Sequence, residues 1–203
     1  MVKVRETATR SSLDGLLSGY LKRERLRQLL PFIPPGANIL DVGCDDAALL
    51  ERLPAFKGYV GLDRGAAVIE RDRQRFRREN VAFICADLAG FSWPGPSFDV
   101  VVMAAVLEHL DGLAPALERL YPLVAENGAL VATTPAAGAR FILHAGAAVR
   151  LFARDSLAEH KHYFRRRDFL GLAGWQLETW RRFEFGLNQL LVLRKRPTLG
   201  PGR

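Results

Sequence analysis

The chain has 203 residues, of which 49% are hydrophobic and 25% are charged, as is typical of one globular domain with a sizeable core. No run approaches the roughly 18 apolar residues that span a bilayer, and residues 1–6 lack the apolar core of a signal peptide, so we expect a cytoplasmic protein. The net charge of +7 favours an anionic partner, but the basic runs hold few aromatic side chains, which argues against a nucleic-acid substrate.

Residues 1–33 are predicted to form an N-terminal helical extension. From Ser12, a suitable N-cap, apolar residues recur at helical spacing as far as about Leu30, and Pro31 then ends the pattern. A leading helix of this kind either packs on a sheet or covers a ligand, and simple packing is the more common case.

Residues 34–196 are predicted to form the main domain, because strand and helix patterns alternate along it. This alternation predicts an α/β fold, a parallel sheet with helices on both faces. The expected strands are 38–42, 59–63, 81–85, 98–103 and 128–133. The expected helices are 47–53, 66–79 and one that Asp111 caps.

The alternation stops after Pro135, and residues 136–165 are predicted to be an insertion. Long insertions in compact domains are usually functional or disordered. The apolar stretch Phe141–Phe152, with its flanking arginines, could roof a pocket for a lipophilic or anionic acceptor or rest on a membrane surface, although plain packing on the sheet is more common. A last helix at 167–173, a hairpin of 176–185 with 190–194, and a loose tail at 197–203 complete the expected elements.

Three acidic residues, Asp41, Asp63 and Asp87, stand where three consecutive predicted strands end. Because a ligand of an open parallel sheet lies outside the carboxyl ends of the strands, these acids should face one crevice. Asp63 follows Asp41 at about the 20-residue interval at which an acidic residue meets a ribose diol, and a carboxylate can accept both hydroxyl hydrogens. The pattern therefore predicts a nucleotide-like ligand.

Five motifs follow one another along the chain: Ile-Leu-Asp-Val-Gly-Cys at 39–44, Val-Gly-Leu-Asp at 60–63, Ala-Asp-Leu at 86–88, the segment 98–102 followed by 106–110, and Asn-Gly-Ala-Leu-Val at 127–131. Their order and spacing resemble those of class I S-adenosylmethionine-dependent methyltransferases. The closest likeness is to the small-molecule branch typified by ubiquinone and menaquinone biosynthesis enzymes. The resemblance implies a Rossmann-like, doubly wound, seven-stranded sheet that is mostly parallel, with an antiparallel last strand.

The resemblance implies S-adenosylmethionine as the cofactor, with its methionine end near the first motif. Asp41 and Gly43, with Cys44 beside them in the motif, would line that end, and the backbone near Ala104 would pass beside the sulfonium. Cys44 and Cys85 are too few for a disulfide framework and fit no metal-ligand spacing, so we expect both thiols to be reduced and no metal to be bound.

The resemblance places the nucleoside end of the cofactor near the second and third motifs. Asp63 would bind the ribose hydroxyls, and Asp87 with Leu88 would hold the adenine. Arg64 could stack on the adenine, because guanidinium planes stack well, or could simply be exposed.

The chain departs from the family in the first motif, where Asp45 and Ala47 stand at usual glycine positions. If Ala47 had to adopt a left-handed backbone, the strain would cost about 1–2 kcal/mol. Asp45 could pair with the α-ammonium of the cofactor, but we favour the reading in which Asp45 or Asp46 caps the helix that follows.

The candidate catalytic residues are His109, His160 and His162, because an oxygen nucleophile benefits from a general base. His109 follows the fourth strand, where the family's acceptor pocket opens, although a lone histidine is usually structural. His160 and His162 would share one face of an extended segment, or would lie in a solvated loop. The two histidines and the nearby Asp155 could be mistaken for a metal site. No third ligand stands at a usual spacing for such a site, so we reject it.

The leading hypothesis is therefore methyl transfer from S-adenosylmethionine to an oxygen of a small-molecule acceptor. The alternative is a non-catalytic protein of the same fold that acts as a partner or regulatory subunit, which the missing glycines suggest. A nicotinamide oxidoreductase is disfavoured, because the sequence holds no Gly-x-Gly-x-x-Gly. The sequence indicates no oligomeric state.

Overall fold

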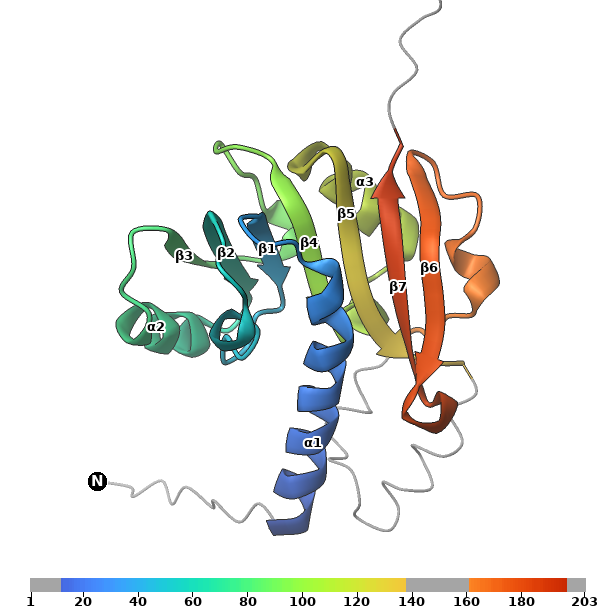
Figure 1. Ribbon diagram of the computed structural model, residues 1–203, viewed down its shortest axis with the longest axis horizontal. Helices are drawn as coiled ribbons and strands as arrows, with labels where there is room; N and C mark the ends of the chain where they lie inside the picture. Colours follow the sequence, from blue (N-terminus) through green and yellow to red (C-terminus); the bar gives the residue numbers. More distant parts are fainter. Residues whose placement is uncertain (1–11, 138–160, 197–203) are drawn as a thin grey trace, which may run out of the picture.

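The computed structural model of the protein describes residues 12–137 and 161–196. Within these ranges, seven strands form one sheet in the order β3-β2-β1-β4-β5-β7-β6 (Figure 1). The strands are β1 (Asn38–Val42), β2 (Gly58–Asp63), β3 (Val81–Cys85), β4 (Phe98–Ala104), β5 (Val124–Pro135), β6 (Trp175–Phe183) and β7 (Asn188–Lys195).

The first five strands are parallel to one another, and β7 is antiparallel to both β5 and β6. This pattern confirms the predicted Rossmann-like sheet with an antiparallel last strand. The chain runs outward from β1 to β3 and then returns to β4 on the other side of β1. Such a reversal is the topological switch point at which open parallel sheets bind ligands.

Helices cover both faces of the sheet, as predicted. The helix α1 (Ser12–Leu29), blue in Figure 1, and α2 (Ala66–Arg75) pack on one face, while α3 (Leu113–Leu120) packs on the other. The short 3₁₀ turns in the described ranges are η1 (Leu30–Phe32), η2 (Leu50–Arg52), η3 (Leu88–Gly90), η4 (Leu107–His109), η5 (Tyr121–Leu123), η6 (Arg166–Phe169) and η7 (Glu184–Gly186).

The central strands are apolar on both faces, because each face carries its own hydrophobic core. In β1, Leu40 belongs to the core under α3, and Ile39 belongs to the core under α1 and α2. In β4, Val101 belongs to the core under α3, and Val102 belongs to the core under α1 and α2. Side chains alternate along a strand, so a continuous Val/Ile/Leu run is what a strand covered on both faces requires.

The helix expected at 47–53 is wrong, because only the 3₁₀ turn Leu50–Arg52 forms there. Asp45 and Ala47 have positive φ angles of 46° and 54°, so the chain leaves the right-handed helical region where the helix should begin. The helix expected at 66–79 is correct in place but ends at Arg75.

Two further expectations about helices need correction. The N-cap of α3 is Gly112 rather than Asp111. The helix expected at 167–173 is only the 3₁₀ turn Arg166–Phe169, because Gly171 and Gly174 adopt left-handed angles of 70° and 76° that end the helical path.

The leading helix and the final hairpin are confirmed as α1 and as β6 with β7. The Phe141–Phe152 stretch, Asp155, His160 and the tail 197–203 lie outside the described residues. The domain limits at 33/34 and 136–165 stay predictions.

Phe169 provides a test of the packing on the α3 face. Its side chain is 1% exposed and contacts the Phe164 ring at 5.6 Å between centroids, whereas the adjacent Leu170 is 48% exposed. We expect Phe169→Ala to lower the free energy of unfolding by about 3–5 kcal/mol in urea denaturation, because it leaves a cavity. The matched control Leu170→Ala should change it by about 0.5 kcal/mol or less; equal effects would contradict this packing.

Candidate active site

The carboxyl ends of β1, β2 and β4 meet beside a cavity of about 210 Å³. Its wall contains Asp41 and Gly43 from the end of β1 and Ala104 from the end of β4. Lys22 and Arg25 of α1 close the cavity from above the sheet. The cavity therefore contains residues that the sequence predicted for the methionine end of the cofactor. It also contains residues of α1, which the sequence analysis did not assign to the cofactor site.

Asp41 is the buried acid of this cavity. Its side chain is 2% exposed, and the Tyr59 hydroxyl donates a hydrogen bond to Asp41 Oδ2 at 2.7 Å. Burial raises the pKa of Asp41 to about 7, against the opposing effects of the Tyr59 hydrogen bond and the positive charge of Lys22. Because burial disfavours the ionised form of Asp41, a cationic group of a ligand placed beside it would stabilise that form.

Gly43 makes the turn that follows β1. Its φ is +71°, and a Cβ built on it would lie 2.5 Å from Val106 Cγ2, so both the backbone angle and the space require glycine. The amides of Gly43 and Cys44 donate to the Leu62 carbonyl oxygen at 2.7 and 3.1 Å. The Cys44 thiol is buried in the core under α1, and this burial raises its pKa, so the thiol has no reactive thiolate character at neutral pH.

The strain anticipated at Ala47 is present, because its left-handed angle is one that glycine adopts freely and that costs alanine about 1–2 kcal/mol. Asp45 is left-handed too, a conformation that aspartate tolerates better than alanine does. Asp46 Oδ1 accepts a hydrogen bond from the Ala48 amide at 3.1 Å, but no α-helix follows, so the predicted helix cap is wrong. Asp45 instead forms an ion pair with Lys22.

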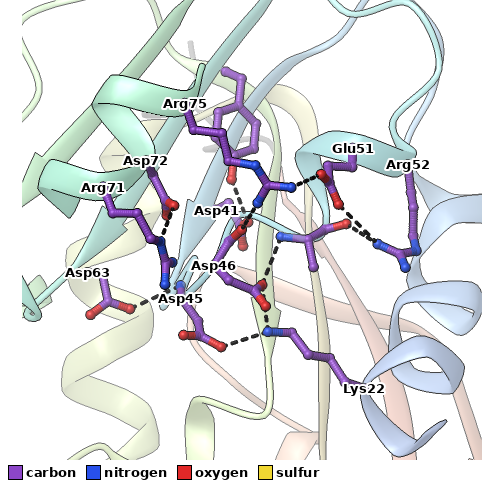
Figure 2. Close-up of polar contacts among 12 residues, drawn as sticks. Lys22, Asp41, Asp45, Asp46, Glu51, Arg52, Asp63, Arg71, Asp72 and Arg75 are labelled. Atoms are coloured by element: carbon purple, nitrogen blue, oxygen red, sulfur yellow. Dashed lines mark hydrogen bonds and ion pairs between the residues drawn. The ribbon is translucent and has the colours of Figure 1, made fainter. Parts of the chain in front are cut away.

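Lys22 and Arg25 were missed in the sequence, although their spacing of three places both on one face of a helix. Lys22 Nζ lies 2.6 Å from both Asp45 Oδ2 and Asp46 Oδ1 (Figure 2). Burial alone would lower the pKa of Lys22, but its hydrogen bonds to the two carboxylates and their negative charges raise it. Arg25 Nε is buried and has no hydrogen-bond partner among the described residues.

Asp63 lies half-buried at the end of β2, as predicted for the ribose acid. Its Oδ1 accepts from the Gly65 amide at 2.8 Å, and its Oδ2 accepts from the Asp45 amide at 3.2 Å. An ionised carboxylate offers about four lone-pair sites, so two remain for the hydroxyls of a diol.

Asp87, Arg64 and Leu88 lie together beyond the ends of β2 and β3. Asp87 Oδ1 accepts from the Ala89 amide at 2.8 Å, and its Oδ2 lies 3.9 Å from Arg64 Nη1. The Arg64 side chain is 72% exposed, and Leu88 is buried. Arg64 thus has an exposed ion pair with Asp87, and its stacking on adenine stays a prediction.

His109 and His162 come from distant parts of the sequence to the same region. His109 is half-buried in η4, directly after β4. The amides of Lys161 and His162 donate to the Glu108 carbonyl oxygen at 2.9 and 3.2 Å, and the His162 ring contacts the Phe164 ring. This docks the segment that carries His162 against η4, whereas His160 lies outside the described residues.

Within residues 12–137 and 161–196, no group of three or more His, Cys, Asp or Glu side chains is arranged to hold a metal ion. Over the same ranges, no helix has the length and apolar character needed to cross a membrane.

A family model described as a methyltransferase domain matches residues 15–176. The chain belongs to the methyltransferase-domain family. An uncharacterized methyltransferase from Mycobacterium tuberculosis (strain H37Rv) is 36% identical over 104 residues, which cover 50% of this chain and 53% of that protein. The trans-aconitate 2-methyltransferase of Methylobacterium radiotolerans is 34% identical over 100 residues, which cover 47% of this chain and 37% of that enzyme. The chain spans about half the length of the first of these relatives.

The methyltransferase fold is also that of the N-methyltransferase NodS from Bradyrhizobium japonicum in complex with S-adenosyl-L-homocysteine. The TM-score is 0.60 at 20% identity, over 91% of this chain and 99% of that chain. Together with the family match, this confirms the predicted methyltransferase domain.

We expect Asp63→Ala to weaken S-adenosylhomocysteine binding about 100-fold or more, since each of two hydrogen bonds to a charged group contributes about 1.5–3 kcal/mol. Isothermal titration calorimetry measures the affinity directly. Glu70→Ala removes an exposed carboxylate of α2 outside the cavity and is the matched control, with no expected change. Equal affinity in Asp63→Ala and the parent would contradict the ribose role of Asp63.

Asp41 should make stability depend on pH. Because its pKa is about 7 in the folded protein and 3.8 is its ordinary value, the folded state retains a proton that the unfolded chain has already lost. The contribution of Asp41 to the free energy of unfolding should therefore fall as pH rises from about 4 to 7. Urea denaturation at pH 5 and pH 8 should show a smaller fall for Asp41→Asn; parallel profiles would show that the pKa is not raised.

Proposed function

We propose that this protein transfers a methyl group from S-adenosylmethionine to an oxygen atom of a small-molecule acceptor. The observation that carries the proposal is that Asp41, Asp45 and the backbone at Ala104 line one cavity, with Asp63 bound to the Asp45 amide, in a chain of the methyltransferase-domain family. The likeness of its motifs to the ubiquinone and menaquinone branch supports a small acceptor. The net charge of +7 supports an anionic acceptor, and the apolar character of the 136–165 insertion supports a lipophilic one.

The residues around the cavity fit the cofactor. Asp41 supplies a buried carboxylate for its α-ammonium. Arg25 supplies a buried donor for its α-carboxylate, because its Nε has no hydrogen-bond partner within residues 12–137 and 161–196. Asp63 has lone pairs left for the ribose hydroxyls. When bound, S-adenosylmethionine supplies an electrophilic methyl group on a positively charged sulfur that is also a good leaving group.

The backbone after β4 is the element that would position the acceptor beside the cofactor. Ala104 and Ala105 line the cavity, and the Ala105 amide donates to the Thr133 carbonyl oxygen at 2.9 Å. Ala105 has a left-handed φ of 58°, which turns the chain from β4 toward η4. Positioning of reactants can contribute about 7–11 kcal/mol to catalysis, which is more than a general base contributes. Placement of the acceptor by this backbone would therefore be the larger part of the mechanism.

A general base would contribute less, about 10²–10⁴-fold in rate. His109 and His162 are the described candidates, because both lie next to the chain that leaves β4. A neutral imidazole there would accept the proton that an acceptor hydroxyl releases as its oxygen is methylated. The Glu108 carboxyl group is buried beside them, and this burial raises its pKa.

The alternative of a non-catalytic partner subunit rested on the glycines missing at positions 45 and 47. Asp45 and Ala47 adopt left-handed conformations without glycine, so the substitutions leave strain in the loop. The family match gives this alternative no support.

The proposal is tested by incubating the protein with S-adenosylmethionine and a panel of hydroxyl, carboxyl and amine acceptors, with products identified by mass spectrometry. We expect methylation of an oxygen-bearing acceptor. With that acceptor, replacing the histidine that acts as base by asparagine should lower kcat about 10²–10⁴-fold and leave S-adenosylhomocysteine affinity unchanged.

The two variants, His109→Asn and His162→Asn, identify the base, and parental kcat in both would exclude a histidine base among the described residues. Methylation of amines alone would contradict the oxygen assignment. Cofactor binding without transfer to any acceptor class would argue for the non-catalytic role.

A further inference from the structure

The loop between β1 and η2 is held from both sides by cations of neighbouring helices (Figure 2). From α1, Lys22 reaches the carboxylates of Asp45 and Asp46 at 2.6 Å each. From α2, Arg75 donates to the Asp46 carbonyl oxygen at 3.4 Å and pairs with Glu51. The loop therefore depends on contacts outside itself.

External support matters here because the loop has a strained backbone. Asp45 and Ala47 occupy left-handed conformations that L-residues disfavour, and the usual glycines are absent. Without a restraint, the loop would relax toward right-handed or extended angles. The Lys22 side chain is 34% exposed, whereas the side chains of Asp45 and Asp46 are 63% and 44% exposed, so the carboxylates of both ion pairs face solvent and Lys22 holds the loop through two pairs at once.

The strained loop is also connected to the cofactor site. The Asp45 amide donates to Asp63 Oδ2, so the position of Asp45 affects the orientation of the candidate ribose acid. Lys22 and Asp45 both line the cavity beside Asp41. A relaxed loop would lose the hydrogen bond to Asp63 and change the shape of the cavity.

We propose that Lys22 is a positioning residue for the cofactor, which holds the loop after β1 in its binding conformation through Asp45 and Asp46 and so replaces the conformational freedom of the missing glycines. The N-terminal helix is then part of the cofactor site and not only a cover of the sheet. This inference rests on the cofactor site of the proposed function. If the loop has its binding conformation in only a fraction of the free protein molecules, the apparent affinity for the cofactor is reduced in proportion to that fraction.

The test measures S-adenosylhomocysteine affinity by isothermal titration calorimetry in Lys22→Met, which keeps the length of the side chain and removes its charge. We expect Kd to rise about tenfold or more, as it does when the competent loop falls to about one tenth of the free population. Lys22→Arg should retain most of the affinity, because it keeps the charge. The melting temperature of each variant without ligand separates a loop effect from general destabilisation.

Arg27→Met is the matched control, because Arg27 lies on the same helix and pairs only locally with Glu24 among the described contacts. Ala47→Gly supplies the decisive comparison, because it relieves strain while leaving both partners of Lys22 in place. In the Ala47→Gly background, Lys22→Met should weaken binding less than threefold.

The outcomes separate this inference from the proposed function. If the parent binds S-adenosylhomocysteine and Lys22→Met binds within twofold of it, the positioning role is overturned and the cofactor site stands. An equal loss in both backgrounds would also overturn it, because Lys22 would then act by another route. No binding by the parent would overturn the cofactor site and this inference together.

Discussion

The left-handed turn at the carboxyl end of β1 is the constraint on which the rest of the site depends. Gly43, Asp45 and Ala47 all have positive φ angles, so the chain turns sharply over the end of the sheet instead of entering a helix at once. This turn brings the Asp45 amide to Asp63 and the Asp45 carboxylate to Lys22. Strain at this position is tolerated because contacts from other elements determine the conformation.

The fold gives this turn its surroundings. The reversal of strand order at β1 leaves β2 and β4 on either side. Asp41 of β1 and the backbone at the end of β4 line one cavity, and Asp63 of β2 is bound to the Asp45 amide in its wall. The helix α1 lies across the same face and contributes cations, Lys22 and Arg25, to a cavity whose sheet side is acidic. The cavity is therefore lined by both carboxylates and cationic side chains, which suits the zwitterionic methionine end of S-adenosylmethionine.

The sequence predicted the strands and the places of Asp41 and Asp63 near their carboxyl ends, because short apolar runs between turn residues have few alternatives in an α/β pattern. The binding roles of these acids stay predictions. It failed where tertiary contacts decide the outcome. The helix expected at 47–53 required the right-handed angles that the loop does not adopt. Lys22 had no signal of its own, because a charged residue on an amphipathic helix is normally solvated, and its partners lie more than 20 residues away.

The proposed function requires that the cavity at the end of β1 bind S-adenosylmethionine and its product. Thermal unfolding of the protein with S-adenosylhomocysteine and with NAD tests this binding directly, since a ligand that binds only the folded state raises the midpoint. We expect a higher midpoint with S-adenosylhomocysteine and an unchanged one with NAD. A shift with NAD alone, or no shift with S-adenosylhomocysteine at millimolar concentration, would contradict this cofactor site.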